Sequence, residues 1–431
     1  MTGAQTEVRP VGDDPSMAVN ARAWSLIRAA LFHHEGENLY AIYAELHKLG
    51  VDFLTPNGTH VVIGYAALGE MMRNPMFRKN NAFGASQKTA AFSDLTVEQQ
   101  QQLDDLYADS APMLGSLDAP DHLRIRNLVQ RAFTVKYVHS MRAKIASEID
   151  ELLSRIDPAA PADISSQFGA LFAPEIMAEL IGLPSEDRAY MARLTATYMR
   201  GIDPAAPFEL RLASARAAHA QRQYVRKIVE DRRQVPRDDL VTALVADPAS
   251  LLSERELVQL LTILYIGGYE TTAHMIGNGL VALLRNHEQL ALLRGDPDKY
   301  MRPAVDEMLR LDGAITYTQV YPAQGAQLLG RPAHKNAPYL GLLTAGNHDP
   351  KIFDRPGDFI IDRPARPILT FGAGPHACLG LNLARLELDM VFRAFLERFP
   401  RMRLLDPKPG RVKLLQQQAF ETVPVLLNPP A

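Results

Sequence analysis

The ten residues Phe371 to Gly380 read Phe-Gly-Ala-Gly-Pro-His-Ala-Cys-Leu-Gly, and they contain the only cysteine of the 431-residue chain. Cys378 therefore has no disulfide partner within the chain, and three glycines punctuate the segment around it. The Leu-Asn-Leu-Ala-Arg-Leu-Glu-Leu run after Gly380 predicts a helix that begins beside the thiol. A helix N-terminus offers N–H donors and the positive end of the helix dipole, which favour a thiolate. A thiolate is also the axial haem ligand that favours O–O cleavage.

Composition limits the class of protein. The chain is 47% hydrophobic and 22% charged, as in a globular protein with a substantial core, and its net charge of −3 implies no general attraction to nucleic acid. The first ten residues contain no apolar run, so we expect neither a signal peptide nor a membrane anchor. A single cysteine is compatible with a reducing compartment, and we expect a cytoplasmic protein.

Helical periodicity dominates the chain, and the strand-like pieces are short. We therefore expect a mainly α fold with small β-sheets (α+β), in which residues 1–20 form a flexible tail and residues 21–431 form a single domain. The predicted elements are a helix over 39–49, a hairpin of 51–54 with 60–63, helices through 97–286, and strands over 339–344 and 423–427.

One helix of more than thirty residues is predicted from Ser253 to about Asn286, with Ser253 and Glu256 as a capping box. Its middle reads Ile266-Gly267-Gly268-Tyr269-Glu270-Thr271-Thr272. Glycines destabilise a helix interior by roughly 1 kcal/mol each, and acidic or hydroxyl side chains are unfavourable in a buried helix. These unfavourable choices indicate that a function requires them.

The cysteine segment and this helix motif together resemble two signatures of the cytochrome P450 family. The first matches Phe-Gly-x-Gly-x-His-x-Cys-x-Gly, and the second matches Gly-Gly-x-Glu-Thr, with Thr271 placed 107 residues before Cys378 (378 − 271). The resemblance implies the cytochrome P450 fold, with haem b between the long central helix and the cysteine-loop helix. It implies that Cys378 is the iron ligand and that Phe371 and Gly372 belong to the cofactor-binding loop.

The resemblance also assigns roles in oxygen chemistry. Gly267 and Gly268 would leave room for O2, and Thr271 would supply a hydroxyl at that place. Glu270 would connect the hydroxyl to solvent as part of a proton relay.

Three further residues resemble the structural ion cluster of the family. Glu307 and Arg310 are three apart, so they share one helix face. In the family such a pair binds a later arginine, which corresponds to Arg363. We expect these residues to hold the cysteine loop in shape and to take no part in catalysis.

The segment Asp118 to Arg126 resembles the family's contact with the haem propionates. His122 and Arg126 lie one helical turn apart, and His376 matches a further propionate donor. Two polar residues common in the family are missing, because their positions hold Val320 and Ile368. The resemblance therefore implies weaker haem retention, an altered propionate pose, or a substitute donor, for which the candidates are Gln319 and His348.

The resemblance places a mostly apolar substrate pocket over the haem. The residues expected to line it are Ile263, Ile266, Gly267, Thr271, Ala314, Thr316 and Phe420. Such a lining suits a small, largely hydrophobic organic substrate. We expect a monooxygenase that uses O2 and electrons from a ferredoxin and its reductase, with a role in natural-product (secondary) metabolism. We expect a monomer without nucleic-acid or membrane partners, and candidate ferredoxin contacts are Arg124, Arg131 and Arg385.

Two alternatives remain at this point. The same fold could support a peroxide-driven or coupling oxidase, although Glu270 and Thr271 favour the use of O2. The chain could also be a degenerate, non-catalytic member that recruits partners, for which the residues at 320 and 368 are the only support.

Overall fold

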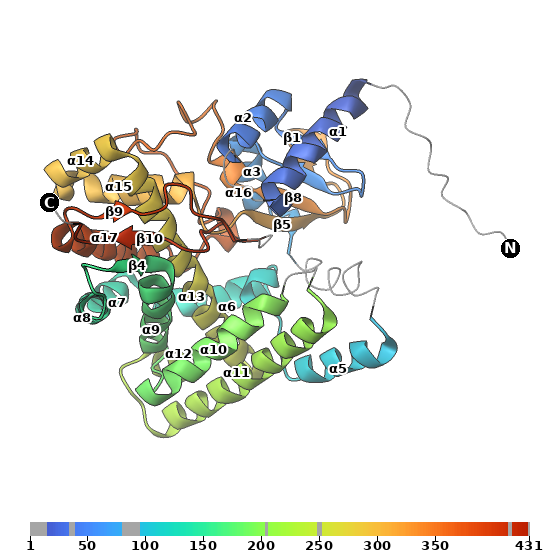
Figure 1. Ribbon diagram of the computed structural model, residues 1–431. Coiled ribbons are helices and arrows are strands. Elements are labelled where there is room, and N and C mark those ends of the chain that lie inside the picture. The colour runs from blue at the N-terminus through green and yellow to red at the C-terminus, as the bar shows by residue number, and fades with distance from the viewer. Residues whose placement is uncertain are drawn as a thin grey trace.

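The computed structural model describes residues 15–33, 39–79, 95–202, 206–247, 252–412 and 416–429. A large helical part lies beside a smaller part, in which the N-terminal helices flank a sheet (Figure 1). The α-helices are α1 Pro15–Arg28, α2 Leu39–Leu49, α3 Tyr65–Arg73, α5 Val97–Tyr107, α6 Asp121–Ala132, α7 Val135–Ser140, α8 Arg142–Ser154, α9 Ala170–Leu180, α10 Ser185–Gly201, α11 Phe208–Gln234, α12 Leu240–Ala246, α13 Glu254–Arg285, α14 His287–Gly295, α15 Pro297–Leu311, α16 Leu343–Gly346 and α17 Leu381–Arg398. Short 3₁₀ or π turns are η1 Ala29–His33, η2 Leu114–Ser116, η3 Ser165–Gly169 and η4 Gly374–His376.

The described strands form three small sheets. The largest has the order β1-β2-β8-β5-β3, in which only the β2–β8 pair is parallel. A second sheet has the order β4-β10-β9, and β6 pairs with β7. The strands are β1 Asp52–Leu54, β2 His60–Val62, β3 Phe77–Arg78, β4 Pro161–Asp163, β5 Tyr317–Pro322, β6 Gln327–Leu328, β7 Arg331–Pro332, β8 Tyr339–Leu342, β9 Arg403–Leu404 and β10 Pro424–Leu426.

Helix α13 crosses the helical part and contacts α9, α11, α15 and α17 (Figure 1). Its 32 residues span roughly 48 Å at 1.5 Å per residue. The predicted capping box starts it, since the Glu256 N–H donates to Ser253 Oγ over 3.3 Å and the Ser253 N–H donates to Glu256 Oε2 over 2.8 Å. The helix is therefore one continuous, well-anchored element, and the Gly-Gly-Tyr-Glu-Thr-Thr segment lies at its middle.

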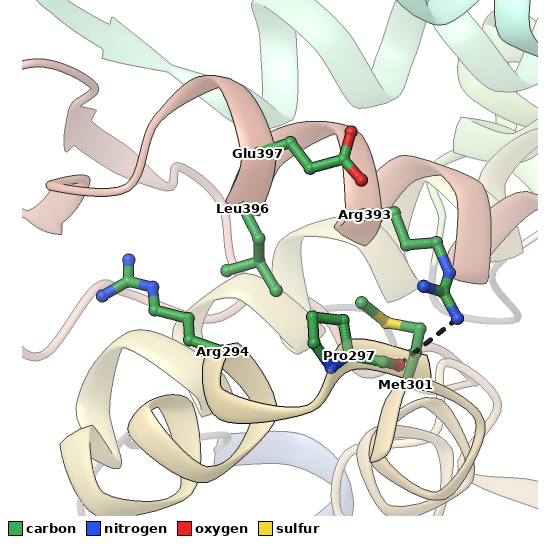
Figure 2. A pocket seen from close by; sticks show the side chains of 6 residues that line it. All are labelled: Arg294, Pro297, Met301, Arg393, Leu396 and Glu397. Carbon is green, nitrogen blue, oxygen red and sulfur yellow. Dashed lines mark hydrogen bonds between the residues drawn. The ribbon is translucent and has the colours of Figure 1, made fainter. Parts of the chain in front are cut away.

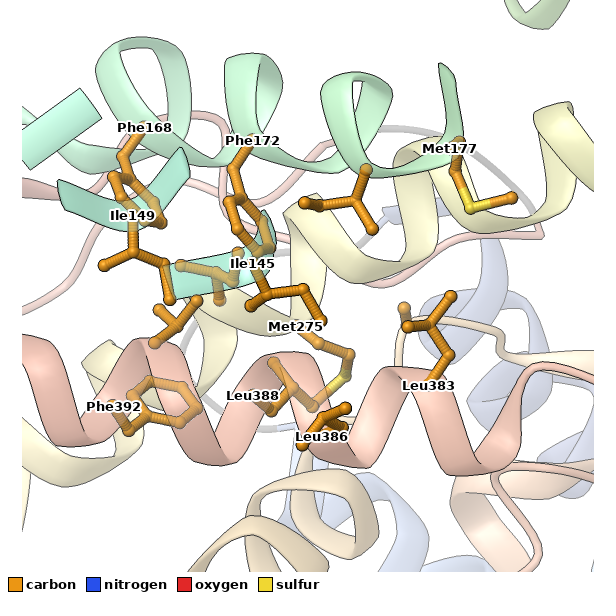
Figure 3. Packing of buried hydrophobic residues seen from close by; sticks show 14 of the residues in the cluster. Ile145, Ile149, Phe168, Phe172, Met177, Met275, Leu383, Leu386, Leu388 and Phe392 are labelled. Atoms are coloured by element: carbon orange, nitrogen blue, oxygen red, sulfur yellow. The ribbon is translucent and has the colours of Figure 1, made fainter. Parts of the chain in front are cut away.

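The hydrophobic core beside α13 also holds α17, the helix that follows the cysteine loop. Leu388 and Phe392 of α17 face Met275 of α13 and the aromatic pair Phe168 and Phe172 (Figure 3). These five side chains are at most 4% exposed. Tight packing of this kind leaves α17 little freedom to shift, so the start of α17 has a fixed place relative to α13.

The predicted fold class is confirmed, and so are the helix over 39–49, the hairpin and the long helix. The strand predicted over 339–344 is wrong at its end, because β8 stops at Leu342 and the chain turns into α16. Helix α1 begins at Pro15, inside the predicted tail, where proline suits the first turn of a helix. Residues 1–14 lie outside the described residues, and the single domain stays a prediction.

Candidate active site

The cysteine loop is a tight hairpin-like turn that packs on the end of α3. The Cys378 N–H donates to the Phe371 carbonyl over 2.8 Å, which closes the loop. Gly372 and Gly374 have φ of +67° and +69°, a conformation that disfavours side chains. A Cβ at Gly374 would also lie 2.5 Å from the Met72 carbonyl oxygen, so only glycine fits there. The glycines thus fix the cysteine's position.

The thiol of Cys378 keeps a solvent-exposed surface, although protein atoms surround it closely enough to raise its pKa through burial. A side chain that faces an internal space is both accessible to solvent and closely surrounded by protein atoms. Its sulfur accepts from the N–H groups of Gly380 and Leu381 at the start of α17, and these donors lower the pKa. The positive charge of Arg126 lowers it further. Burial outweighs these effects, so the protein alone favours the protonated thiol.

Open space also lies beside the middle of α13. Gly267 is exposed within this largely buried helix, and a Cβ added to it would meet no atom within 4 Å. Gly268 has the opposite surroundings, since a Cβ there would lie 2.2 Å from Met177 Sδ of α9. Only Gly267 borders open space, whereas the missing side chain of Gly268 lets α9 approach.

A hydroxyl and a carboxylate lie beside this space. Thr271 Oγ1 donates to the Gly267 carbonyl over 2.9 Å, so its lone pairs stay available as acceptors. Glu270 Oε2 accepts from Gln417 Nε2 over 2.6 Å. Burial raises the pKa of Glu270, and the Gln417 bond partly opposes this. The carboxyl therefore exchanges its proton closer to neutral pH than a free glutamate does.

Gln417 is held by the segment that precedes β5. The Thr316 N–H donates to the Gln416 carbonyl over 3.1 Å, and the Gln418 N–H donates to the Ala314 carbonyl over 2.8 Å. The sequence reasoning missed Gln417, because nothing in a run of three glutamines shows which one meets α13.

A second carboxyl connects α13 to α17. Thr272 Oγ1 donates to Glu387 Oε2 over 3.1 Å, and both side chains are buried. Burial raises the pKa of Glu387 to about 8, against which the Thr272 bond acts weakly. Glu387 therefore holds a proton at neutral pH. The sequence reasoning missed it too, although an acid between Leu386 and Leu388 was a signal.

Four basic side chains gather beside the cysteine loop. The rings of His122 on α6 and His376 on η4 are 4.0 Å apart between centroids, and Arg126 lies one turn after His122. Burial is the main cause that lowers the pKa of His376 to about 3, and the charges of His122, Lys79 and Arg126 contribute to this lowering. We call these four residues the basic cluster. No ion pair to an acid is seen for any of them within the described ranges.

The predicted ion cluster is closed on itself. Arg310 donates to both carboxylate oxygens of Glu307, over 2.7 and 2.8 Å, and Arg363 Nε donates to Glu307 Oε1 over 3.2 Å. Arg310 also donates to the backbone carbonyls of Asn347, Pro356 and Asp358. Glu307 and Arg310 are 5% and 1% exposed. The structure thus brings together the three residues that the sequence paired.

This ion cluster reaches the cysteine loop through Asn347. Its backbone carbonyl binds Arg310, while its side chain accepts from the Leu369 N–H over 2.8 Å and donates to Thr370 Oγ1 over 2.9 Å. Leu369 and Thr370 lead directly into Phe371. The ion cluster therefore fixes the first residues of the loop.

The expected pocket residues do not all lie together. Ile263 and Ile266 pack with Tyr198 and Ala217 of α10 and α11. Ala314 and Thr316 are buried, at 3% and 2% exposure.

Phe420 is a correction to the predicted pocket. Its ring lies under the guanidinium groups of Arg411 and Arg285, at 4.4 and 5.4 Å from the ring centroid. Arg285 ends α13, 18 residues or roughly 27 Å beyond Gly267 along the helix. The ring therefore belongs to the core at the far end of α13.

Neither proposed substitute donor joins the basic cluster. His348 is fully buried, stacks on Tyr40 with ring centroids 5.0 Å apart, and bonds the Thr344 carbonyl. Gln319 directs its amide to the Tyr321 hydroxyl over 3.0 Å. Both expectations are wrong, because the Gln319 amide is bound within β5 and His348 is buried against Tyr40 and Tyr43. The Nε2 atom of His348 has no hydrogen-bond partner among the described residues.

The three arginines proposed for ferredoxin binding each hold an acid of this chain. Arg124 pairs with Glu256, Arg131 with Asp247 and Arg385 with Asp306. Their charge is therefore partly neutralised, which weakens them as contacts for an acidic partner.

The clefts on the surface lie away from the site. One of about 190 Å³ lies between α14, α15 and α17 and is lined by Arg294, Met301 and Leu396 among others (Figure 2). Leu396 is roughly 22 Å from the start of α17, at 1.5 Å per residue. This cleft thus lies at the opposite end of α17 from the cysteine loop. Within the described part of the chain, no helix is long and apolar enough to span a bilayer.

Comparisons with known proteins agree with one another. The family model "Cytochrome P450" matches residues 207–410. Cytochrome P450 monooxygenase PikC of Streptomyces venezuelae is 32% identical over 86% of each chain. The biotin biosynthesis cytochrome P450 of Bacillus subtilis is 28% identical over 90% of this chain and 96% of its own length.

Solved structures resemble the whole fold. P450BioI, crystallised with an acyl carrier protein that carries hexadec-9Z-enoic acid, has a TM-score of 0.80 and 27% identity, over 90% of this chain and 98% of its own. CalO2 has a TM-score of 0.81 and 26% identity, over 91% and 96%.

Proposed function

Because the chain belongs to the cytochrome P450 family and is a haem-thiolate monooxygenase, we propose that it oxidises a small, largely hydrophobic molecule in natural-product biosynthesis. Its cofactor is haem b. The proposed reaction converts R–H, O2, two electrons and two protons into R–OH and water. A ferredoxin and its reductase would supply the electrons, and the chain would work in the cytoplasm. The single observation that carries the proposal is one exposed thiol in a rigid loop that leads into α17, the helix packed against α13.

We propose Cys378 as the iron ligand. It is the only thiol in the chain, and the N–H groups of Gly380 and Leu381 already point at its sulfur. Those donors would stabilise a thiolate once a cation compensates for burial, because a metal ion deprotonates the thiol that binds it. When bound, the haem supplies the activation of O2.

The basic cluster fits the other end of the haem. Two propionates bring two negative charges, and His122, Arg126 and His376 offer N–H donors to them. Among these three, the charge of a carboxylate, that of Asp118, acts on His122. Charge-assisted hydrogen bonds of this kind are about twice as strong as neutral ones. Phe371 and Gly372 would support the loop from which His376 and Cys378 extend.

The protons would pass along α13. The open space beside Gly267 would admit O2, with the Thr271 hydroxyl next to it. Glu270 would pass protons inward, because burial raises its pKa and makes it a better proton carrier than a free glutamate. Gln417 would keep its carboxylate oriented. This arrangement favours the use of O2 over a peroxide-driven reaction.

The ion cluster would have a structural role. Glu307, Arg310 and Arg363 satisfy one another and lie beneath the residues that lead into the loop. They would keep the cysteine at its place without touching the substrate.

The relatives' names suggest the substrate class. They include 6-deoxyerythronolide B hydroxylase of Saccharopolyspora erythraea, 33% identical over 68% of this chain, and the polyketide biosynthesis cytochrome P450 PksS of Bacillus subtilis. Ile263 and Ile266 are the apolar residues of α13 that would meet such a substrate.

Oxygen labelling tests this function. Macrolactones and acyl chains are first screened for the spectral change that follows displacement of iron-bound water. Any hit is then incubated with ferredoxin, its reductase and ¹⁸O2. The proposal predicts a product with one ¹⁸O atom. A product labelled from H2¹⁸O, or formed only with added peroxide, would contradict it.

A further inference from the structure

Strand β5 has Val320 at one of the two positions where a polar residue common in the family is missing, and in many soluble members of the family that residue is an arginine. Val320 is 3% exposed and packs in an apolar cluster with Leu68, Met71 and Phe77. A valine cannot bind an anion, so this edge of the basic cluster needs another cation or has none.

The neighbouring strand brings a lysine to the same place. Strands β3 and β5 are antiparallel, with Phe77 opposite Pro322 and Arg78 opposite Tyr321. Continuing that register by one residue puts Lys79 opposite Val320. Side chains of directly opposite residues lie on the same face of a sheet.

The contacts of Lys79 agree with this register. Its ammonium donates to Thr318 Oγ1 and to the Gln319 carbonyl, each over 2.7 Å. Thr318 is two residues from Val320, so both side chains lie on one face of β5. The ammonium thus reaches the face that residue 320 occupies.

The ammonium of Lys79 also interacts electrostatically with the other residues of the basic cluster. Its charge acts on the pKa of His376 together with those of His122 and Arg126. The oxygens that accept from it are both neutral, and they use two of its three N–H donors. The Asp118 carboxylate accepts the Lys79 backbone N–H over 2.8 Å, which orients the residue, and its negative charge also acts on the ammonium.

We propose that Lys79 replaces the missing cation at residue 320 and binds a haem propionate from the opposite strand. This inference rests on the proposed function, because it needs haem held by Cys378. It explains how the chain dispenses with a charged residue on β5. The proposed donor is on β3 instead of β5, and its ammonium group lies on the same face of the sheet as residue 320.

A purely structural role is the competing explanation, since Lys79 also ties β3 to β5. Lys79→Gln separates the two roles, because glutamine can still donate to Thr318 and Gln319 but carries no charge. Haem release from the purified holoenzyme to excess apomyoglobin is measured together with the reduction potential. We expect release to become about ten- to hundredfold faster, as for loss of one hydrogen bond to a charged group. The potential should become more negative.

Three variants complete the test. Lys79→Arg should keep slow release, and Lys335→Met, at an exposed site, should change nothing. In the Lys79→Gln background, Val320→Arg should restore slow release if it folds with an unchanged melting temperature. A folded double variant that releases haem as fast as Lys79→Gln would contradict the shared role of the two positions.

Lys79→Gln with wild-type release and potential would overturn the proposal. In that case a retained red-shifted Soret band with carbon monoxide would show that the thiolate-haem function itself still holds. Loss of that band in the wild-type protein would instead reject the proposed function.

Discussion

Two clusters of charged side chains border the cysteine loop, and they differ in how their charge is balanced. Glu307 and Arg310 are buried and Arg363 is partly buried, and both arginines bind Glu307 and backbone carbonyls. The basic cluster of Lys79, His122, Arg126 and His376 gathers basic side chains. No ion pair with an acid is seen for them in the described structure, although the charge of Asp118 acts on Lys79 and His122. A cluster that satisfies itself supports a fold, whereas one that leaves positive charge unbalanced is suited to an anionic ligand.

The largest effect on stability should come from breaking the ion cluster. Glu307→Ala leaves the buried Arg310 and the partly buried Arg363 without their carboxylate, so the free energy of unfolding should fall by about 3–5 kcal/mol. Urea unfolding measures it. Glu151→Ala, which breaks an exposed pair with Arg155, is the matched control and should change stability by less than about 1 kcal/mol. A similar small loss for Glu307→Ala would remove the structural role.

Glu387, a buried acid with no charged partner, should make the stability of the protein depend on pH. The pKa of Glu387 is raised from 4.5 to about 8 by burial. Between these values the native state holds one more proton than the unfolded chain, so the free energy of unfolding falls as pH rises. We expect a loss of roughly 2–4 kcal/mol, below a ceiling of about 5 kcal/mol set by the pKa difference. Glu387→Gln should flatten this loss in urea titrations from pH 4.5 to 8, and an unchanged slope would contradict the assignment.

The basic cluster should respond in the opposite way to the ion cluster, since losing one of its residues should weaken haem binding and not the fold. Arg126→Gln removes repulsion from the haem-free protein, yet it should speed haem release to apomyoglobin by about ten- to hundredfold. Arg131→Gln, on the same helix and paired with Asp247, is the control and should keep the wild-type rate. If Arg126→Gln lowered the melting temperature of the haem-free protein and left release unchanged, the cluster would be structural after all.

The smallest effect should fall on the relay. Gln417→Ala removes the amide that orients Glu270, so product formed per electron consumed should drop by about tenfold, with more hydrogen peroxide released. Gln416→Ala is the neighbouring control, since that side chain is exposed. Equal coupling in the two variants would exclude Gln417 from the relay.

The sequence predicted what is local or motif-bound. The hairpin, the long helix, the cysteine loop and the Glu307–Arg310–Arg363 contacts follow from spacing, capping and resemblance. It could not predict contacts set by tertiary register. Lys79 meets Thr318 across 239 residues, and Gln417 meets Glu270 across 147.

Phe420 shows the opposite error. Its apolar ring suited a pocket by composition, but it is held in the core by Arg285, which ends α13, and by Arg411 of the C-terminal segment. Gln319 and His348 were also misplaced, because the sequence does not reveal that Gln319 binds the Tyr321 hydroxyl or that His348 is buried against Tyr40 and Tyr43.

The most direct test of the central claim is the carbon monoxide difference spectrum of the reduced, purified protein. The account predicts a strongly red-shifted Soret band, from haem held by the Cys378 thiolate, and predicts that Cys378→Ala abolishes it. An unshifted band in the wild-type protein, or a red-shifted band that survives Cys378→Ala, would contradict the claim that this single thiol holds the haem.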